Sequence, residues 1–362
     1  MTDCLVVGGG LLGMLTARFL NEAGAEVLVL DKSELGHEAS WAGGGILSPL
    51  YPWRYDDAVT ALASYGQPRY RELAEALAAE SGVDPEWTPS GLLMLDVEDA
   101  GDAAAWGQRH ALSVETVTAT HTLEIEPALA DGQGGGVWMP DVAQIRNPRL
   151  VKAMRGSLMH RGIAFREGVA VDRLIVEDGR ARGVHTSEGE LRAERVLVAS
   201  GSWSAELLAS AGVHIEVEPV RGQMILFGAR PDTLTRIVLA GDRYLIPRRD
   251  GHILCGSTLE HTGFDKSTTQ TAMEELHAAA IERVPALADF PVVKHWAGLR
   301  PGSPRGIPYI GEHPEIRGLF VNAGQYRNGV VLGLASAQLA ADQILGRAPV
   351  LDPAPYGFRS PH

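Results

Sequence analysis

Three glycines near the start of the chain have a spacing that can hold a phosphate group. Gly8, Gly10 and Gly13 follow an apolar segment, residues 4–7, and open a second apolar segment, residues 11–21. In such a pattern the first glycine allows a tight turn, the second lets a pyrophosphate approach the backbone, and the third lets a helix pack closely on a strand. The N–H groups at the start of that helix bind the phosphates. The spacing predicts a dinucleotide-binding unit.

An acidic residue completes this unit. Asp31 follows a second apolar segment, residues 26–30, at about 20 residues beyond the glycines. A carboxylate at this place accepts hydrogen bonds from both hydroxyls of an adenosine ribose, which favours FAD or NAD over NADP. Because the chain has 42 glycines, a plain structural turn is the alternative. The order of strand, glycines, helix, strand and acid favours the dinucleotide site.

Composition limits the class of protein. A length of 362 residues predicts two domains of ordinary size. The hydrophobic fraction of 45% and the charged fraction of 21% are typical of a soluble globular protein. A net charge of -13 disfavours nucleic acid or an anionic membrane as a partner. We expect neither a membrane-spanning segment nor a secretory signal, and therefore a cytoplasmic location.

Other chemistries lack the residues that they require. The 12 histidines form no Cys/His pair or HExxH-like group with metal-ligand spacing, so we expect no metal site. Cys4 and Cys255 lie in apolar segments, which favours buried thiols over a disulfide. The chain also lacks the GxSxG and GxxxxGK[ST] motifs of hydrolases and NTPases.

The elements that would position these residues are interleaved along the chain. Periodicity predicts helices over residues 11–21, 58–81, 148–160, 269–284 and 330–345. Strands are predicted over residues 92–97, 164–176, 183–186, 195–199, 217–227, 244–247 and 252–257. Those over residues 164–199 are predicted to form a meander around Asp178-Gly179, and residues 249–251 a hairpin turn. The N-terminus of the helix over residues 330–345 would stabilise negative charge on a reduced flavin; simple packing against a sheet is the alternative.

Several motifs together resemble the FAD-dependent amine oxidases, a family that includes D-amino acid oxidase, sarcosine oxidase and glycine oxidase. Besides the glycine pattern, they are EASWAGGGIL (38–47), VASGSWS (198–204), RYLIPRRDGHILCGST (243–258), GLRPGSPRGIPYIG (298–311) and QYRNGVVL (325–332). The last three are far more restrictive than the glycine pattern. Within the family, the glycine oxidases of thiamine biosynthesis are the most similar.

The resemblance implies an α/β fold with a discontinuous domain organisation. A Rossmann-like FAD-binding domain would comprise residues 1–85, 145–215 and 298–362. An interleaved α+β domain with an antiparallel sheet, residues 86–144 and 216–297, would bind the substrate.

The resemblance also implies which residues contact FAD. These residues are Gly8, Gly10, Leu11, Leu12 and Gly13 at the pyrophosphate; Asp31 and Lys32 at the ribose; Ala39, Ser40, Gly44, Gly45 and Ile46 along the pyrophosphate and ring; Val171 near the adenine; and Gln325, Tyr326, Arg327, Asn328, Gly329, Val330 and Val331 at the pyrimidine end of the flavin. Some relatives attach the flavin through Cys or His. Here the early loop has Ala42 and Gly43, and the C-terminal loops lack Cys, so we expect non-covalent FAD.

A carboxylate substrate needs a cation, and Arg300 is the candidate because its planar fork matches a carboxylate bidentately. Tyr244 would donate a second hydrogen bond to the same carboxylate, and the backbone carbonyl of Arg327 would hold the amine. The alternatives are a structural ion pair for Arg300, a core aromatic for Tyr244 and a surface charge for Arg327. Met224 and Leu259 are expected to shape the pocket.

The implied reaction is hydride transfer from the substrate Cα to flavin N5, assisted by the lone pair of the neutral amine. The imine would hydrolyse to glyoxylate and ammonia when glycine is the substrate, and O2 would reoxidise the flavin and give hydrogen peroxide. Thiazole synthase is implied as an acceptor of the imine, and a homo-oligomer as the assembly. The alternatives are a sarcosine or D-amino acid oxidase, a flavin-dependent D-amino acid dehydrogenase that passes electrons to a quinone, and an FAD-binding protein without catalysis.

Overall fold

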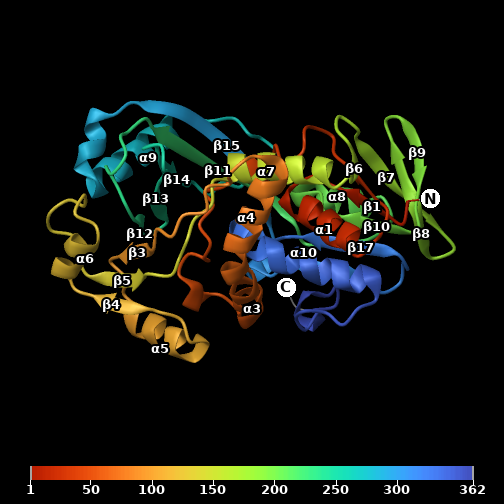
Figure 1. Ribbon diagram of the computed structural model, residues 1–362, viewed down its shortest axis with the longest axis horizontal. Helices are drawn as coiled ribbons and strands as arrows, with labels where there is room; N and C mark the ends of the chain where they lie inside the picture. The colour runs from red at the N-terminus through yellow and green to blue at the C-terminus, as the bar shows by residue number, and fades with distance from the viewer. Residues whose placement is uncertain (1, 361–362) are drawn as a thin grey trace.

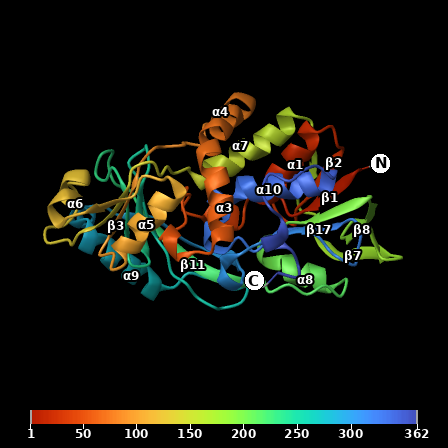
Figure 2. The same ribbon diagram turned by 90° about the horizontal axis from the view of Figure 1, so that it is seen from below.

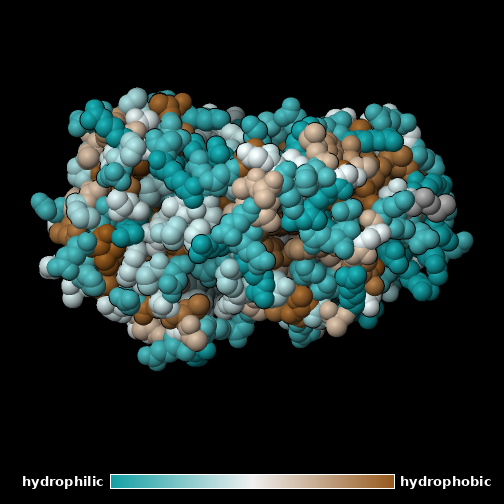
Figure 3. Space-filling view, in the orientation of Figure 1, coloured by the Kyte–Doolittle hydropathy of each residue, from teal (hydrophilic) through white to brown (hydrophobic). Residues whose placement is uncertain are grey.

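Two large sheets lie side by side along the long axis of the molecule, and a small third sheet lies beyond one of them (Figure 1). The structure is a computed structural model and describes residues 2–360. The face of the molecule seen in Figure 3 is largely hydrophilic, with small and separate hydrophobic areas.

The first sheet has six strands in the order β16-β17-β10-β1-β2-β6. They are β1 (Cys4–Val7), β2 (Val27–Leu30), β6 (Ala164–Arg166), β10 (Arg195–Val198), β16 (Tyr309–Glu312) and β17 (Leu319–Ala323). All neighbours are parallel except β16, which is antiparallel to β17. Both faces of a parallel sheet are covered, which explains why the central strand β1 is apolar and buried at every residue.

Helices cover one face of this sheet, and the small sheet and one helix cover the other. The helices of the described chain as a whole are α1 (Leu11–Glu22), α2 (Ala39–Ala42), α3 (Asp57–Gly66), α4 (Tyr70–Ser81), α5 (Ala100–His110), α6 (Ala119–Ile125), α7 (Asn147–His160), α8 (Ser204–Ala209), α9 (Gln270–Arg283) and α10 (Gly329–Leu345). Helices α1, α4, α7 and α10 share one hydrophobic core with the sheet. The opposite face packs on α8 and on the small sheet of β7 (Val171–Glu177), β8 (Arg180–Thr186) and β9 (Gly189–Arg192) (Figure 2).

The second large sheet has eight strands in the order β15-β11-β14-β13-β12-β3-β5-β4. They are β3 (Leu92–Leu95), β4 (Glu115–Val117), β5 (Gly136–Met139), β11 (Glu218–Phe227), β12 (Ile237–Ala240), β13 (Arg243–Pro247), β14 (Ile253–Gly256) and β15 (Val292–Gly302). The sheet is antiparallel except that β12 and β3 are parallel. Its register places Gly222 opposite Gly298, and it aligns Tyr244, Gly256 and Met224 across three neighbouring strands.

The structure corrects several predicted elements. The helix predicted over residues 58–81 is divided into α3 and α4 by a 3-10 turn, Gln67–Arg69. Pro68 lies within this turn and cannot donate a backbone hydrogen bond to a continuous helix. The predicted strand over residues 164–176 is two strands, β6 and β7, in different sheets. The strand over residues 195–199 is not part of the meander, because β10 belongs to the parallel sheet and β9 completes the meander.

Every strand of the six-stranded sheet falls in residues 1–85, 145–215 or 298–362, whereas β15 runs from Val292 to Gly302 and crosses the predicted boundary at 298. We therefore retain the domain division as a proposal, with β15 shared.

Within residues 2–360, no helix is both long and apolar enough to cross a bilayer. In the same part of the chain, no three His, Cys, Asp or Glu side chains are grouped to hold a metal. Cys4 and Cys255 are free and buried, and burial raises the pKa of each thiol to about 12.

Candidate functional site

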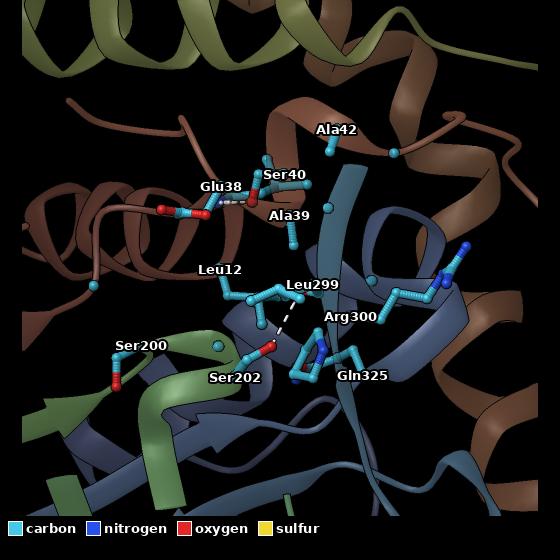
Figure 4. A pocket seen from close by; sticks show the side chains of 18 of the residues that line it. Leu12, Glu38, Ala39, Ser40, Ala42, Ser200, Ser202, Leu299, Arg300 and Gln325 are labelled. Carbon is cyan, nitrogen blue, oxygen red and sulfur yellow. Dashed lines mark hydrogen bonds between the residues drawn. The ribbon is translucent and has the colours of Figure 1, made fainter. Parts of the chain in front are cut away.

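A cavity of about 500 Å³ lies between the two large sheets. Its walls come from segments that are far apart in the sequence: the turns after β1, β2 and β10, the loop that contains α2, the strands β11, β13 and β15, and the loop before α10. Figure 4 shows part of this convergence, with Glu38, Ala39 and Ser40 on one side of Leu299, and Ser202 and Gln325 on the other. The hydroxyl of Ser202 donates to the carbonyl of Leu299 at 3.1 Å, and this bond joins the turn after β10 to β15.

The glycine turn at the end of β1 is packed so tightly that side chains are excluded. A Cβ at Gly8, whose φ is +108°, would lie 2.4 Å from the carbonyl oxygen of Ala199. A Cβ at Gly13 would lie 1.9 Å from the carbonyl oxygen of Gly8, so this glycine brings α1 onto the turn. Gly10, Leu11 and other residues at the start of α1 line the cavity. The first N–H groups of a helix have no partner within the helix, which makes this end a site for an anion.

Asp31 lies at one end of the cavity and is held in a fixed orientation. One carboxylate oxygen accepts a hydrogen bond from the backbone N–H of Gly9 at 2.7 Å. The other accepts from the backbone and the hydroxyl of Ser33 at 2.8 and 3.0 Å. A carboxylate has about four acceptor positions, and three are occupied, so Asp31 retains capacity for one further donor. Asp31 can therefore accept a hydrogen bond from a hydroxyl group of a sugar.

Next to Asp31, an aromatic wall contributes to the same end of the cavity. The ammonium of Lys32 lies 3.3 Å from the ring centroid of Trp203, and both residues line the cavity. Burial lowers the pKa of Lys32. We did not predict Trp203 as a site residue; the sequence feature that could have indicated it is the run of small residues 199–202 immediately before it.

The loop around α2 forms the middle of the cavity wall. The hydroxyl of Ser40 accepts a hydrogen bond from the backbone N–H of Leu11 at 2.9 Å, and its carbonyl accepts from the side chain of Asn147 at 2.7 Å. Gly45 has a φ of +78°, and a Cβ there would lie 1.9 Å from the carbonyl oxygen of Ile145. These contacts fix the α2 loop against the start of α1 and against residues 145–147.

The loop before α10 presents polar atoms that have no protein partner. Gln325 and Asn328 are buried and line the cavity, and neither the Gln325 Oε1 nor the Asn328 Nδ2 has a hydrogen-bond partner in the described chain. Buried polar atoms are normally satisfied. This loop is therefore suited to a bound group that offers both donors and acceptors. The N-terminus of α10, at Gly329, adds the positive end of a helix dipole.

Arg300 lies in the wall formed by β15 and β11, away from Asp31. Its guanidinium donates to the Ser257 hydroxyl at 2.6 Å and to the backbone carbonyls of Thr258 and Arg221 at 3.2 and 3.3 Å. Among the described residues, no carboxylate lies within 4.0 Å of it, so it is not part of a structural ion pair. Burial lowers the pKa of Arg300; Tyr244 raises it and Arg327 lowers it further. A partly buried cation with neutral partners can bind an external anion.

Tyr244 lies close enough to Arg300 to raise its pKa, and the register of the sheet places Met224 beside Tyr244. The two face each other across Gly256, and the Tyr244 hydroxyl lies 3.4 Å from the Met224 sulfur. A Cβ at Gly256 would lie 2.8 Å from the Tyr244 hydroxyl, so glycine is required for this contact. The Tyr244 side chain is 8% exposed and faces the cavity. The cavity thus has an end that can accept a hydrogen bond from a sugar hydroxyl, at Asp31, and an anion-binding end, at Arg300.

Most of the predicted site residues line this single cavity. They are Gly8, Gly10, Leu11, Leu12, Asp31, Lys32, Ala39, Ser40, Gly44, Gly45, Ile46, Val171, Met224, Tyr244, Arg300, Gln325, Tyr326, Arg327, Asn328, Gly329 and Val330. Gly13 and Val331 lie outside it: Gly13 packs on Gly8, and Val331 is buried in the core between α3 and α10. The prediction that Leu259 shapes the pocket is wrong, because this side chain is 44% exposed and lies outside the cavity.

The cavity fits FAD. Asp31 offers an acceptor for a ribose hydroxyl, and the start of α1 offers N–H groups for a pyrophosphate. The unpaired Gln325 Oε1 and Asn328 Nδ2 before α10 suit the polar edge of a flavin ring. The residues that line the cavity, all within the described chain, include no Cys or His. The chemistry of this donor set therefore suits a cofactor that is not covalently attached.

The fold and the site define a dinucleotide-dependent oxidoreductase that has a second sheet for its substrate. Residues 3–343 match the model of a family described as FAD dependent oxidoreductase. The chain belongs to this family, and FAD is its cofactor.

Comparison with individual proteins agrees with this assignment. The chain is 50% identical to a glycine oxidase of Pseudomonas putida over 97% of both chains. It is 31% identical to the bifunctional protein ThiO/ThiG of Synechocystis sp., over 95% of this chain and 52% of that protein. Among solved structures, glycine oxidase from Geobacillus kaustophilus matches with a TM-score of 0.93 and 30% identity over 99% of each chain.

Proposed function

We propose that this protein oxidises glycine, and also sarcosine and small D-amino acids, to the corresponding imine, with O2 as electron acceptor and hydrogen peroxide as product. The observation that carries the proposal is Arg300, a guanidinium in the cavity wall that has no carboxylate partner in the described chain. A group of this kind binds the carboxylate that every α-amino acid has. The relatives named glycine oxidase support glycine as the substrate.

The chain's own residues orient the substrate. Arg300 binds the substrate carboxylate through two parallel hydrogen bonds, and the Tyr244 hydroxyl donates to the same carboxylate. The backbone carbonyl of Arg327 accepts a hydrogen bond from the amine. The side chain of Arg327 is exposed, so the backbone of this residue, rather than its side chain, faces the cavity. Bound FAD supplies the two-electron oxidation, with the substrate Cα–H bond as the source of the hydride. Tyr244 and Met224 limit the space for a substrate side chain.

A panel of substrates tests the proposal. The purified protein is supplied with FAD in air, and hydrogen peroxide is measured with glycine, sarcosine, D-alanine and D-proline at equal concentration. Peroxide from glycine and sarcosine with comparable kcat/KM is the expected result. A clear preference for D-proline would assign a D-amino acid oxidase instead. Reduction of an artificial electron acceptor without peroxide would assign a dehydrogenase.

The product and the assembly are part of the same proposal. A relative named ThiO/ThiG supports a role in thiamine thiazole synthesis, in which thiazole synthase consumes the imine before it hydrolyses to glyoxylate and ammonia. The family resemblance supports a cytoplasmic homo-oligomer. Glyoxylate that fails to accumulate when thiazole synthase is present would support transfer of the imine; size-exclusion chromatography with light scattering measures the assembly.

A further inference from the structure

A second buried arginine stands behind the cavity wall. Arg248 follows β13 and is 8% exposed. Its guanidinium donates to the carbonyl of Gly44 at 2.7 Å, to the side-chain oxygen of Gln144 at 2.7 Å and to the carbonyl of Ile145 at 3.4 Å. Gly44 lines the cavity and Arg248 does not, so Arg248 acts on the cavity through the backbone of Gly44.

The charge of Arg248 has no acidic partner within the part of the chain that the structure describes. The two acids that influence it, Glu86 and Asp250, are both paired with Arg146, at 3.2 and 2.8 Å. Burial lowers the pKa of Arg248 to about 10, which leaves the guanidinium charged at neutral pH. A buried cation that is held only by neutral oxygens is costly unless negative charge develops nearby.

The position of Gly44 shows where this charge acts. A Cβ at Gly44 would lie 3.3 Å from the Tyr244 hydroxyl, so the segment lies next to the anion-binding end of the cavity. This is the end at which the flavin ring meets the substrate when Arg300 and Tyr244 bind the substrate carboxylate. The pyrophosphate and the adenosine belong to the opposite end, at Asp31. The charge of Arg248 therefore lies behind the part of the wall that faces the ring.

The surrounding hydrogen bonds fix the direction of Arg248. The side-chain nitrogen of Gln144 donates to the Ser90 hydroxyl at 2.6 Å and to the carbonyl of Pro247 at 2.8 Å. With both donors used, its oxygen faces Arg248. The guanidinium of Arg248, which is hydrogen-bonded to Gln144 and Gly44, is pre-organised and loses little entropy for each hydrogen bond.

We propose that Arg248 is a positioning residue for the flavin: it fixes the backbone of residues 43–46 through the Gly44 carbonyl, and its positive charge behind this segment favours the negatively charged, reduced flavin. The first effect strengthens the binding of FAD. The second raises the reduction potential of the bound flavin. Neither depends on which amine is the substrate, so failure of this proposal and failure of the proposed function are distinguishable.

Two substitutions separate the two effects. Arg248→Gln removes the charge and the fork, whereas Arg248→Lys keeps the charge and loses the fork. The control is Arg249→Gln, since Arg249 is the exposed neighbour that pairs with Asp84 at 2.8 Å. FAD affinity is measured by titration of the apoprotein, and the midpoint potential of the bound flavin by anaerobic equilibration with a reference dye.

We expect Arg248→Gln to weaken FAD binding by about tenfold, as for loss of a charged hydrogen bond, and to lower the midpoint potential. Arg248→Lys should weaken FAD binding to a similar degree but keep a potential near that of the native protein. Arg249→Gln should change neither. A lower melting temperature of Arg248→Gln with native potential and native FAD affinity would overturn the proposal, because Arg248 would then only stabilise the fold. If Arg248→Gln does not fold, native FAD affinity in Arg248→Lys overturns it.

Discussion

At the scale of single residues, Gly222 determines whether Arg300 can lie flat in the cavity wall. A Cβ at Gly222 would lie 2.1 to 2.3 Å from three atoms of the guanidinium, which is much closer than a van der Waals contact. We predict that Gly222→Ala displaces the guanidinium and lowers kcat/KM for glycine by about tenfold or more, as expected for a misplaced binding group, while FAD stays bound.

The control for this prediction is Gly101→Ala. Gly101 lies in α5, and a Cβ there would meet nothing within 4 Å. Steady-state kinetics with glycine measure kcat/KM of both variants and test this prediction. Equal kcat/KM in Gly222→Ala and the native protein would show that Arg300 can move without loss, which would remove it from the proposed substrate site.

A substitution of Arg300 itself tests its charge. Arg300→Ala removes the only contacts that the proposal assigns to the guanidinium, and the loss of a bidentate carboxylate pair is worth about 2 to 3 kcal/mol. We therefore expect a loss of about 30- to 100-fold or more in kcat/KM, with the flavin absorbance retained. Arg305→Ala, at an exposed position nearby in the sequence, is the control. Retained kinetics in Arg300→Ala would contradict the proposed function.

Residue types in restrictive motifs allowed most of these positions to be predicted. The order of the glycine pattern, and the resemblance of the motif that contains Arg300, carried enough information to predict that these residues line one cavity. Arg248 and Trp203 were not predicted, because one acts through a backbone carbonyl and the other through a ring beside Lys32, and both contacts depend on tertiary packing. Leu259 was misplaced because the family resemblance alone assigned it to the pocket, whereas the chain beyond Thr258 turns to the surface.

At the scale of elements, Glu80 joins three helices that cover the first sheet. It lies on α4 and accepts hydrogen bonds from Ser157 of α7, from Arg161 directly after α7, and from Arg18 of α1. Burial alone would raise the pKa of Glu80, but these hydrogen bonds outweigh it and lower the pKa to about 2. The packing of α1, α4 and α7 therefore includes an electrostatic contribution that depends on pH.

The sign of this dependence follows from the lowered pKa. The contribution of ionised Glu80 to the free energy of unfolding is fully present above the pKa of the unfolded state, 4.5, and is lost as the pH falls towards 2. After allowance for partial exposure we expect about 2 kcal/mol. Glu80→Gln should lose this amount at pH 7 and should show a flatter decline between pH 4.5 and 2. Urea unfolding over a pH series measures it.

Glu75→Gln is the matched control, because Glu75 lies on the same helix and forms an exposed pair with Arg71. Its free energy of unfolding should differ little from that of the native protein. If Glu80→Gln and Glu75→Gln change the free energy of unfolding equally, the hydrogen bonds of Glu80 do not stabilise the packing of the three helices.

Helices α9 and α10 were predictable from the sequence, whereas several strands of the second large sheet were not. The bounds of α9 and α10 agree with prediction because caps mark them: Thr269 accepts from the backbone N–H of Ala272, and Gly346 ends α10 in a left-handed conformation. Strands β4, β5 and β12 have three or four residues and were missed. Such strands are stabilised by their neighbours in the sheet rather than by their own residues.

At the scale of the whole molecule, the cavity between the sheets couples cofactor binding to stability. FAD binds only the folded chain, so it adds about 2.7 kcal/mol at a concentration of 100 times its Kd. We expect the melting temperature of the apoprotein to rise by several degrees with FAD and less with FMN, which lacks the adenosine that Asp31 and Trp203 would contact. Differential scanning fluorimetry measures this, and equal shifts with FMN and FAD would contradict the role of the Asp31 end.

The cavity wall is completed only late in the synthesis of the chain. The glycine turn leaves the ribosome first, yet β1 is held between β2 and β10, and the wall is complete only when residues up to Val330 have been made. At a translation rate of about 5 to 20 residues per second, roughly 15 to 60 seconds separate these events. Until β10 has been made, the apolar strand β1 lacks one of its two partners in the sheet and is prone to aggregation. A prematurely terminated chain that lacks β17 and α10 will carry an intact glycine turn but no retained flavin, and will be a substrate for proteases.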